Sequence, residues 1–151
     1  AVPTQPVQPA QRLDANLDNR VRLIGYDLAL EEGQARSGSD LPVTLYWQVT
    51  GALDKDYTVF IHLLDVNETI AGQGDAPPLE GSYPTSLWSG AQTLTDRHHL
   101  LVHDDAPPGG YRIEVGLYDR TTMERLPVLD SGGMPTGDRI ALTTIQLMPR
   151  R

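Results

Sequence analysis

The chain has 151 residues, a length typical of one domain, and 20 acidic side chains against 12 lysines and arginines give it a formal net charge of −8. Such an acidic surface repels phosphate backbones, so we expect no nucleic-acid partner. The sequence contains no cysteine, which excludes disulfides, thiolate metal sites and a cysteine nucleophile. No apolar run approaches the ~20 residues that span a bilayer.

The first 19 residues are predicted to form a proline-rich linker that is largely disordered. Residues 1–11 contain three prolines and three glutamines without any hydrophobic period, a composition typical of a semi-extended tether. Residues 20–148 then make up a single β-sandwich domain. We expect the linker to connect this domain to a larger body on its N-terminal side.

The domain is predicted to consist of short β-strands, because apolar and polar residues alternate over most of its segments. The predicted strands are residues 21–30, 41–50, 56–65, 68–74, 92–102, 111–119, 124–129 and 139–147. The first of them changes phase in its middle, which a β-bulge at Gly25 would produce. The third is apolar on both faces, so we expect it to be central, with another segment covering Phe60 and Leu64.

This succession of short strands, without an amphipathic helix, predicts an all-β fold: an antiparallel immunoglobulin-like two-sheet sandwich of about 7–9 strands. Tyr111 supports the immunoglobulin-like form, because a tyrosine near the start of a late strand anchors the preceding corner through its hydroxyl in such sandwiches. Trp47 and Phe60 are expected to be structural residues. The chain lacks a cysteine pair, and Trp47 lies on the second predicted strand, so a jelly roll is the alternative.

Seven segments of the chain carry a resemblance to a known family: residues 21–27, 45–47, 56–65, 83–88, 107–111, 115–119 and 125–128. Together they resemble a domain at the C-terminal end of bacterial multi-spanning membrane proteins of the lipid-phosphate-sugar-dependent glycosyltransferase type. The resemblance implies a β-sandwich on the non-cytoplasmic side, tethered to an N-terminal membrane region that would carry any catalysis, and therefore no catalytic residue here. A second resemblance, of architecture, is to the sandwich domains that recognise polysaccharide on O-antigen ABC transporters.

The irregular segment 75–90 is the best candidate for a binding site, because long loops on a rigid scaffold often carry function. Tyr83 and Trp88 are amphipathic aromatic residues suited to stacking on a sugar ring. Asp75 and Glu80 are suited to hydrogen bonding with sugar hydroxyls.

A structural interpretation competes with this one. Leu87 and Trp88 would instead cover Phe60 and Leu64. His62 is a further candidate ligand-binding residue, and its competing interpretation is a hydrogen-bonded core residue.

Other patterns do not indicate catalysis or metal binding. His99 and His103 would lie about 13 Å apart on a strand at ~3.3 Å per residue, too far for one ion. Asp65 and Asn67 lack the glycine and the distal glutamate of a helix–loop–helix calcium site. No nucleophile elbow or phosphate-binding loop is present. We therefore expect no metal, no cofactor and no enzymatic activity.

The favoured function is a non-catalytic accessory domain outside the cytoplasm that binds a glycan or a lipid-linked sugar in support of a membrane glycosyltransferase-like protein. The alternative is a structural or protein–protein interaction domain without a small-molecule ligand. Trp88 distinguishes the two interpretations. In a binding site, Trp88→Ala would abolish glycan binding without lowering the melting temperature, whereas in the core it would cost much stability.

Overall fold

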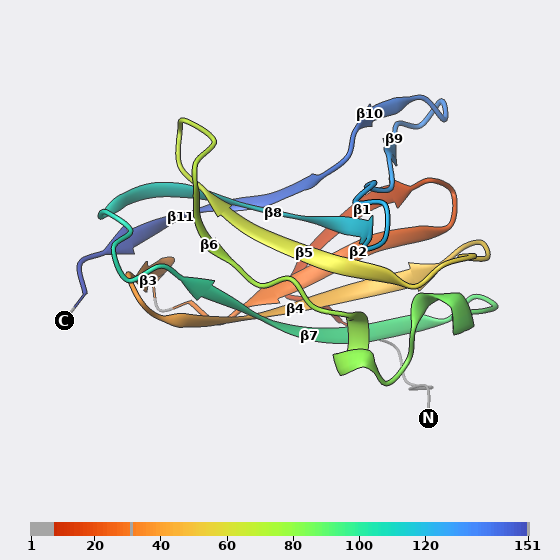
Figure 1. The fold of residues 1–151 in the computed structure, drawn as a ribbon, viewed down its shortest axis with the longest axis horizontal. Helices are drawn as coiled ribbons and strands as arrows, with labels where there is room; N and C mark the ends of the chain where they lie inside the picture. Colours follow the sequence, from red (N-terminus) through yellow and green to blue (C-terminus); the bar gives the residue numbers. More distant parts are fainter. Residues whose placement is uncertain (1–7, 31, 151) are drawn as a thin grey trace.

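The computed structural model describes residues 8–30 and 32–150 of the chain. Eleven strands and two short 3-10 helices make up its regular structure, which confirms the all-β prediction (Figure 1). None of the helices in these described ranges has the length and apolar character needed to cross a bilayer. The elements are β1 (Gln11–Leu17), β2 (Val21–Leu28), β3 (Gln34–Arg36), β4 (Asp40–Val49), β5 (Tyr57–Leu64), β6 (Ile70–Gln73), η1 (Pro78–Gly81), η2 (Thr85–Leu87), β7 (Thr93–Val102), β8 (Gly109–Asp119), β9 (Val128–Leu129), β10 (Pro135–Gly137) and β11 (Ile140–Met148).

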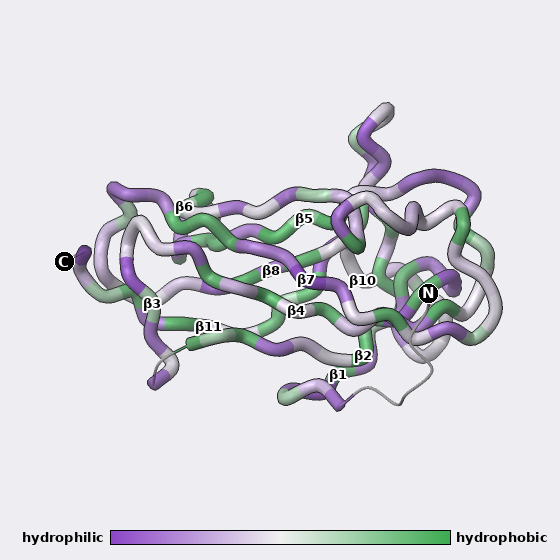
Figure 2. Tube along the Cα trace, turned by 90° about the horizontal axis from the view of Figure 1, so that it is seen from below, coloured by the Kyte–Doolittle hydropathy of each residue, from purple (hydrophilic) through white to green (hydrophobic). Residues whose placement is uncertain are grey.

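The strands form one curled sheet in the order β10-β9-β1-β2-β4-β7-β6-β5-β8-β11-β3, in which β3 and β11 pair in parallel. The sheet folds over, so that β5, β8 and β11 lie above β4 and β7 in Figure 1, and the two groups overlap in Figure 2. β6 joins the two layers, because it pairs with β5 on one side and with β7 on the other. The described strands thus form one continuous sheet, where the sequence predicted two separate sheets.

The hydrophobic core lies between the two layers. Alternating residues of the long strands point inward, and burying each large apolar side chain contributes about 1.5–3 kcal/mol. Tyr26 of β2 also ties the layers together, because its hydroxyl donates a 2.9 Å hydrogen bond to the carbonyl oxygen of Leu142 beside it in β11. Core residues from both layers include Leu23, Val43, Leu45, Trp47, Leu94, Leu100, Val59, Ile61, Leu63, Ile113, Val115 and Leu117.

The N-terminal prediction was wrong for residues 11–17, which form β1 where a disordered linker was expected. β1 pairs with β2 on one side and with β9 on the other, and Leu17 is fully buried. A register shift between Arg12 and Ala15 breaks the alternation that reveals a strand. Residues 1–7 of the expected linker lie outside the described residues.

The structure contains two local features that the sequence predicted. The register between β2 and β4 shifts between Leu23 and Gly25, which places a bulge where the phase change indicated one. The Tyr111 hydroxyl donates a 2.6 Å hydrogen bond to the carbonyl oxygen of Pro107, the corner contact expected from the sequence. Both features depend on residues close together in the chain.

Candidate functional site

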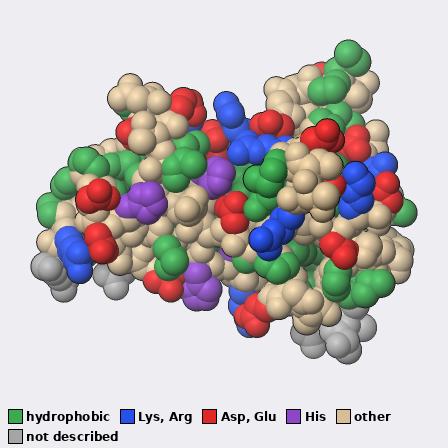
Figure 3. Space-filling model, in the orientation of Figure 1, with side chains coloured by type: hydrophobic (Ala, Val, Ile, Leu, Met, Phe, Trp, Pro, Cys, Tyr) green, Lys and Arg blue, Asp and Glu red, His purple; other side chains and the backbone are tan. Residues whose placement is uncertain are grey.

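The outer face of β5 and β8, which points away from the core, carries a group of polar and aromatic side chains. Phe60 pairs with Gly116, and His62 pairs with Glu114. Directly paired residues lie on the same face of a sheet, so these side chains and Tyr118 share one surface. The β5–β6 turn and the β9–β10 hairpin rise on either side of it in Figure 1, and Figure 3 shows the saddle between them, where basic and acidic side chains gather.

Asp75, at the start of segment 75–90, reaches this surface. Its carboxylate Oδ1 lies 3.5 Å from His62 Nε2, and both side chains are partly buried. Burial raises the pKa of Tyr118, and the Asp75 carboxylate, as a negative charge and as the acceptor of a hydrogen bond from the Tyr118 hydroxyl, raises that pKa further. The structure therefore brings two of the predicted site residues together and adds Tyr118.

Phe60 lies between Gly116 and Arg125. A methyl group added at Gly116 would come within 2.4 Å of the Phe60 ring, so the ring rests directly on the glycine. The Arg125 guanidinium carbon lies 4.1 Å from the ring centroid on the outer side, and the ring is only 1% exposed. The ring centroids of His62 and Tyr118 lie 5.1 and 6.3 Å from that of Phe60.

This arrangement differs from the cover expected for Phe60. Leu87, one of the two expected covering residues, is 61% exposed, and Trp88, the other, belongs to the core cluster between the layers. Arg125 covers the ring instead. It reaches this position because Arg125 forms an isolated bridge with Tyr118 beside the end of β8.

Beside the aromatic group, Glu114 is a buried carboxylate between two arginines. Arg112 Nε donates to it at 2.7 Å, and Arg139 Nε lies 3.4 Å away. Arg112 also donates to Glu68 from the β5–β6 turn. These charges offset the cost of burying the Glu114 carboxylate. The adjacent hollow has a volume of about 440 Å³ and is lined by Glu114, Thr136, Gly137, Asp138, Arg139 and Ala141.

The other predicted site residues lie elsewhere. Trp88 is 3% exposed, and its indole N–H donates a 2.8 Å hydrogen bond to the carbonyl oxygen of Tyr83. The Tyr83 hydroxyl donates to Gln92 at 2.9 Å. Trp88 is therefore almost fully buried, contrary to the expectation of a stacking surface. Glu80 belongs to η1 and lines a separate hollow of about 310 Å³ against β7.

A buried polar cluster centred on Asp96 anchors segment 75–90 to β7 and β4. The Asp96 carboxylate is fully buried and accepts hydrogen bonds from the Trp47 indole N–H at 3.0 Å and from the Leu79 backbone N–H at 2.8 Å. His98 Nε2 lies 2.6 Å from the same carboxylate. His99, the next residue, is on the exposed side of β7. Among the described residues, no group of three or more His, Asp or Glu side chains is arranged to hold a metal ion.

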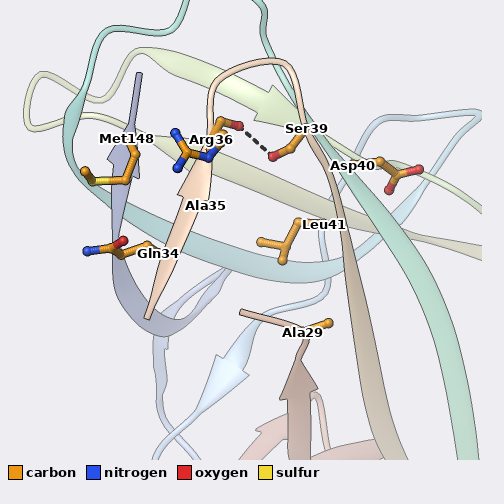
Figure 4. A pocket seen from close by; sticks show the side chains of 8 residues that line it. All are labelled: Ala29, Gln34, Ala35, Arg36, Ser39, Asp40, Leu41 and Met148. Atoms are coloured by element: carbon orange, nitrogen blue, oxygen red, sulfur yellow. Dashed lines mark hydrogen bonds between the residues drawn. The ribbon is translucent and has the colours of Figure 1, made fainter. Parts of the chain in front are cut away.

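A further hollow, of about 250 Å³, lies at the open end of the curled sheet between β3 and the start of β4 (Figure 4). Ser39 Oγ donates to the Arg36 carbonyl oxygen at 2.6 Å, and the Arg36 guanidinium donates to the Pro149 carbonyl oxygen at 2.9 Å. These polar groups are thus engaged within the protein. The hollow contains none of the site residues that the sequence predicted.

Comparison with known proteins supports the class of fold. No family model and no curated protein matches the chain. Among solved structures, the C-terminal domain of wzt aligns with 95% of this chain and 83% of its own length, with a TM-score of 0.54 and 13% identity. A second structure, of AvmM, which catalyses macrocyclization in alchivemycin A biosynthesis, has 13% identity and a TM-score of 0.34 over 93% of this chain and 96% of AvmM.

The chain is therefore an all-β domain whose architecture is similar to that of the C-terminal domain of wzt. At 13% identity the similarity concerns the fold alone, because one fold hosts many functions. The resemblance to membrane proteins of the glycosyltransferase type stays a prediction.

Proposed function

We propose that this domain is a non-catalytic accessory domain that binds a glycan or a lipid-linked sugar on the outer face of β5 and β8. The observation that carries the proposal is the 3.5 Å contact of Asp75 with His62, beside the covered ring of Phe60 that His62 and Tyr118 border. Binding sites typically combine an apolar surface with a few convergent polar groups, and this face carries such polar groups around the Phe60 ring, which lies beneath Arg125.

The chemistry of these groups suits sugar hydroxyls. An ionised carboxylate accepts up to about four hydrogen bonds, so Asp75 keeps acceptor capacity beyond its two neighbours. A phenol and an imidazole both donate and accept. Two neighbouring strands hold His62 and Tyr118, and groups on strands are positioned more rigidly than groups on loops.

Two likenesses support a role in glycan binding. The architecture is similar to that of the C-terminal domain of wzt, and the predicted architecture resembles the sandwich domains that recognise polysaccharide on O-antigen ABC transporters. Neither likeness identifies the binding residues, so the choice of this face depends on the geometry of Asp75, His62 and Tyr118.

The test is titration of the domain with a panel of bacterial oligosaccharides, followed by calorimetry and by NMR. We expect Asp75→Asn to weaken binding about tenfold or more, because it removes a charged hydrogen-bond acceptor. Tyr118→Phe should weaken it about two- to tenfold. Asp105→Asn, an exposed position between β7 and β8, is the control for the loss of one charge. Binding that is absent, or equal in all variants, would contradict the proposal.

The proposed setting is outside the cytoplasm, with the domain attached to an N-terminal membrane region in a longer protein. This part of the proposal depends on the resemblance in sequence to glycosyltransferase-type membrane proteins. Fusion of alkaline phosphatase to the C-terminus of the full-length natural protein tests it, because that enzyme becomes active only outside the cytoplasm. An inactive fusion would contradict the proposed location.

The alternative, a protein–protein interaction domain, is favoured by one observation. Met123 and Met134 are 68% and 64% exposed, and the β9–β10 hairpin that carries Met134 rises from the sheet (Figure 1). Methionine is common at adaptable binding surfaces. Light scattering tests this alternative. Self-association that increases with protein concentration, and that is absent in Met134→Gln, would support it.

A further inference from the structure

We propose that the Phe60 ring is the stacking surface for the apolar face of a neutral pyranose, and that Arg125 covers this surface while no ligand is bound. The proposal rests on the proposed glycan-binding function and names both the ring that would contact the sugar and the side chain that must move.

Phe60 is buried, but it does not belong to the hydrophobic core between the two layers. It lies on the outer face of β5, and its neighbours Val59 and Ile61 belong to the core cluster between the layers whereas Phe60 does not. Its inner side rests on Gly116, a position where any larger residue would displace the ring. The Cε2–Cζ edge of the ring thus meets the backbone at Gly116, and the Arg125 guanidinium lies over a face of the ring.

The Arg125 guanidinium stacks on a face of the Phe60 ring. Its side chain is 30% exposed, and its ion pair in the structure is a 3.4 Å contact with Asp138, whose side chain is 51% exposed. Exposed ion pairs of this kind contribute little to stability. The arginine side chain is long and flexible, so it can leave the ring without disturbing the sheet.

A guanidinium and a pyranose make the same kind of contact with an aromatic ring. Both present hydrogens with partial positive charge to the negative face of the ring. Arg125 therefore stands where the C–H face of a sugar would lie. The rings of His62 and Tyr118 are tilted by 37° and 48° against Phe60 and border this position.

The charges beside the ring favour a neutral sugar, because Arg112 and Arg139 on this face are already paired with Glu68 and Glu114. Asp75 contacts His62 at the border of the ring, and the protein carries a net charge of −8. An anionic sugar would meet a carboxylate at the ring and a repulsive field on its approach. A neutral pyranose instead offers hydroxyls to Asp75 and its C–H face to Phe60.

The experiment uses the methyl glycosides of glucose, galactose and mannose with the wild type, Arg125→Ala and Phe60→Leu. We expect nuclear Overhauser contacts between sugar C–H protons and the Phe60 ring in the wild type. Arg125→Ala should bind about two- to fivefold more tightly, because no cation–π contact has to be broken. Phe60→Leu should bind about three- to tenfold more weakly. Arg120→Ala, an exposed position on the same turn, is the control.

Each outcome decides between the two proposals. Oligosaccharide binding that leaves the Phe60 signals unchanged and is not strengthened by Arg125→Ala overturns the stacking role but leaves the proposed function standing. Binding of oligosaccharides without binding of any methyl glycoside would likewise overturn the stacking role and leave the proposed function standing. If no sugar binds the wild type or Arg125→Ala, both proposals fall. Should Phe60→Leu fail to fold, the nuclear Overhauser contacts and Arg125→Ala still decide.

Discussion

The indole N–H of Trp88 donates a hydrogen bond to the carbonyl oxygen of Tyr83 over 2.8 Å. This hydrogen bond joins the two ends of segment 83–88. The indole ring lies in the core, and Trp88 is 3% exposed. Segment 75–90 is therefore packed by its own side chains, and Asp75 at its start keeps a defined position on the outer face.

Trp88→Ala should destabilise the domain strongly. Removing a buried tryptophan side chain leaves a cavity and costs about 3–5 kcal/mol of unfolding free energy. Urea denaturation followed by circular dichroism measures this loss. Leu87→Ala, at the neighbouring and mostly exposed position, should change stability by less than about 0.5 kcal/mol. A similar small change for both variants would show that Trp88 is not a core residue.

Asp96→Ala should also destabilise the domain. Asp96 accepts hydrogen bonds from Trp47 and from the backbone of Leu79, and it contacts His98. Its removal leaves these buried polar groups without a partner, which costs about 3–5 kcal/mol in the free energy of unfolding. Thermal and urea denaturation measure the effect, and Asp105→Ala, at an exposed position, is the matched control. An Asp96 variant as stable as this control would refute the prediction.

Gly116→Ala tests the close contact between Gly116 and Phe60. The added methyl group would lie 2.4 Å from the ring, so Phe60 or the strand must move. We expect a loss of about 1–3 kcal/mol of stability, as for other overpacked sites. Gly137→Ala is the control, because its added methyl group would meet no atom within 4 Å. Equal melting temperatures for both variants would count against the contact.

Asp119 should contribute to the loss of stability in acid. Its pKa is lowered, first by the hydrogen bond from the Thr121 backbone N–H and also by Lys55, while burial opposes the shift. Because the pKa is lower in the folded state, the stabilisation is complete above the unfolded value of about 3.9 and is lost as the pH falls through the folded value.

Urea denaturation between about pH 5 and pH 2 measures this dependence. Asp119→Asn should lose less stability over this range than the wild type does. Asp105→Asn should follow the wild type. An Asp119 variant with the same acid dependence as the wild type would contradict the assignment.

The strand β4 shows how far the sequence alone could predict the structure. Leu41, Val43, Leu45, Trp47 and Val49 alternate with more polar residues, and all five are buried. Alternation with a period of two follows from the geometry of a single extended strand, so it is visible without knowing the neighbours. The same reasoning located most of the long strands to within two residues.

Short strands were not predictable in this way. β3 and β10 have three residues each, and they are strands only because β11 and β9 lie beside them. The predicted strand 124–129 shortens to Val128–Leu129. Three residues are too few to show a hydrophobic period, so such strands emerge from pairing with a neighbour.

The sequence by itself determined the all-β class, the bulge near Gly25 and the corner hydrogen bond of Tyr111, because each depends on backbone geometry and residues close together in the chain. Only the tertiary structure decided that Asp75 joins His62 and that Arg125 covers Phe60. Those residues come from distant segments, and the register that brings distant strands together depends on packing, which a local hydrophobic period does not specify.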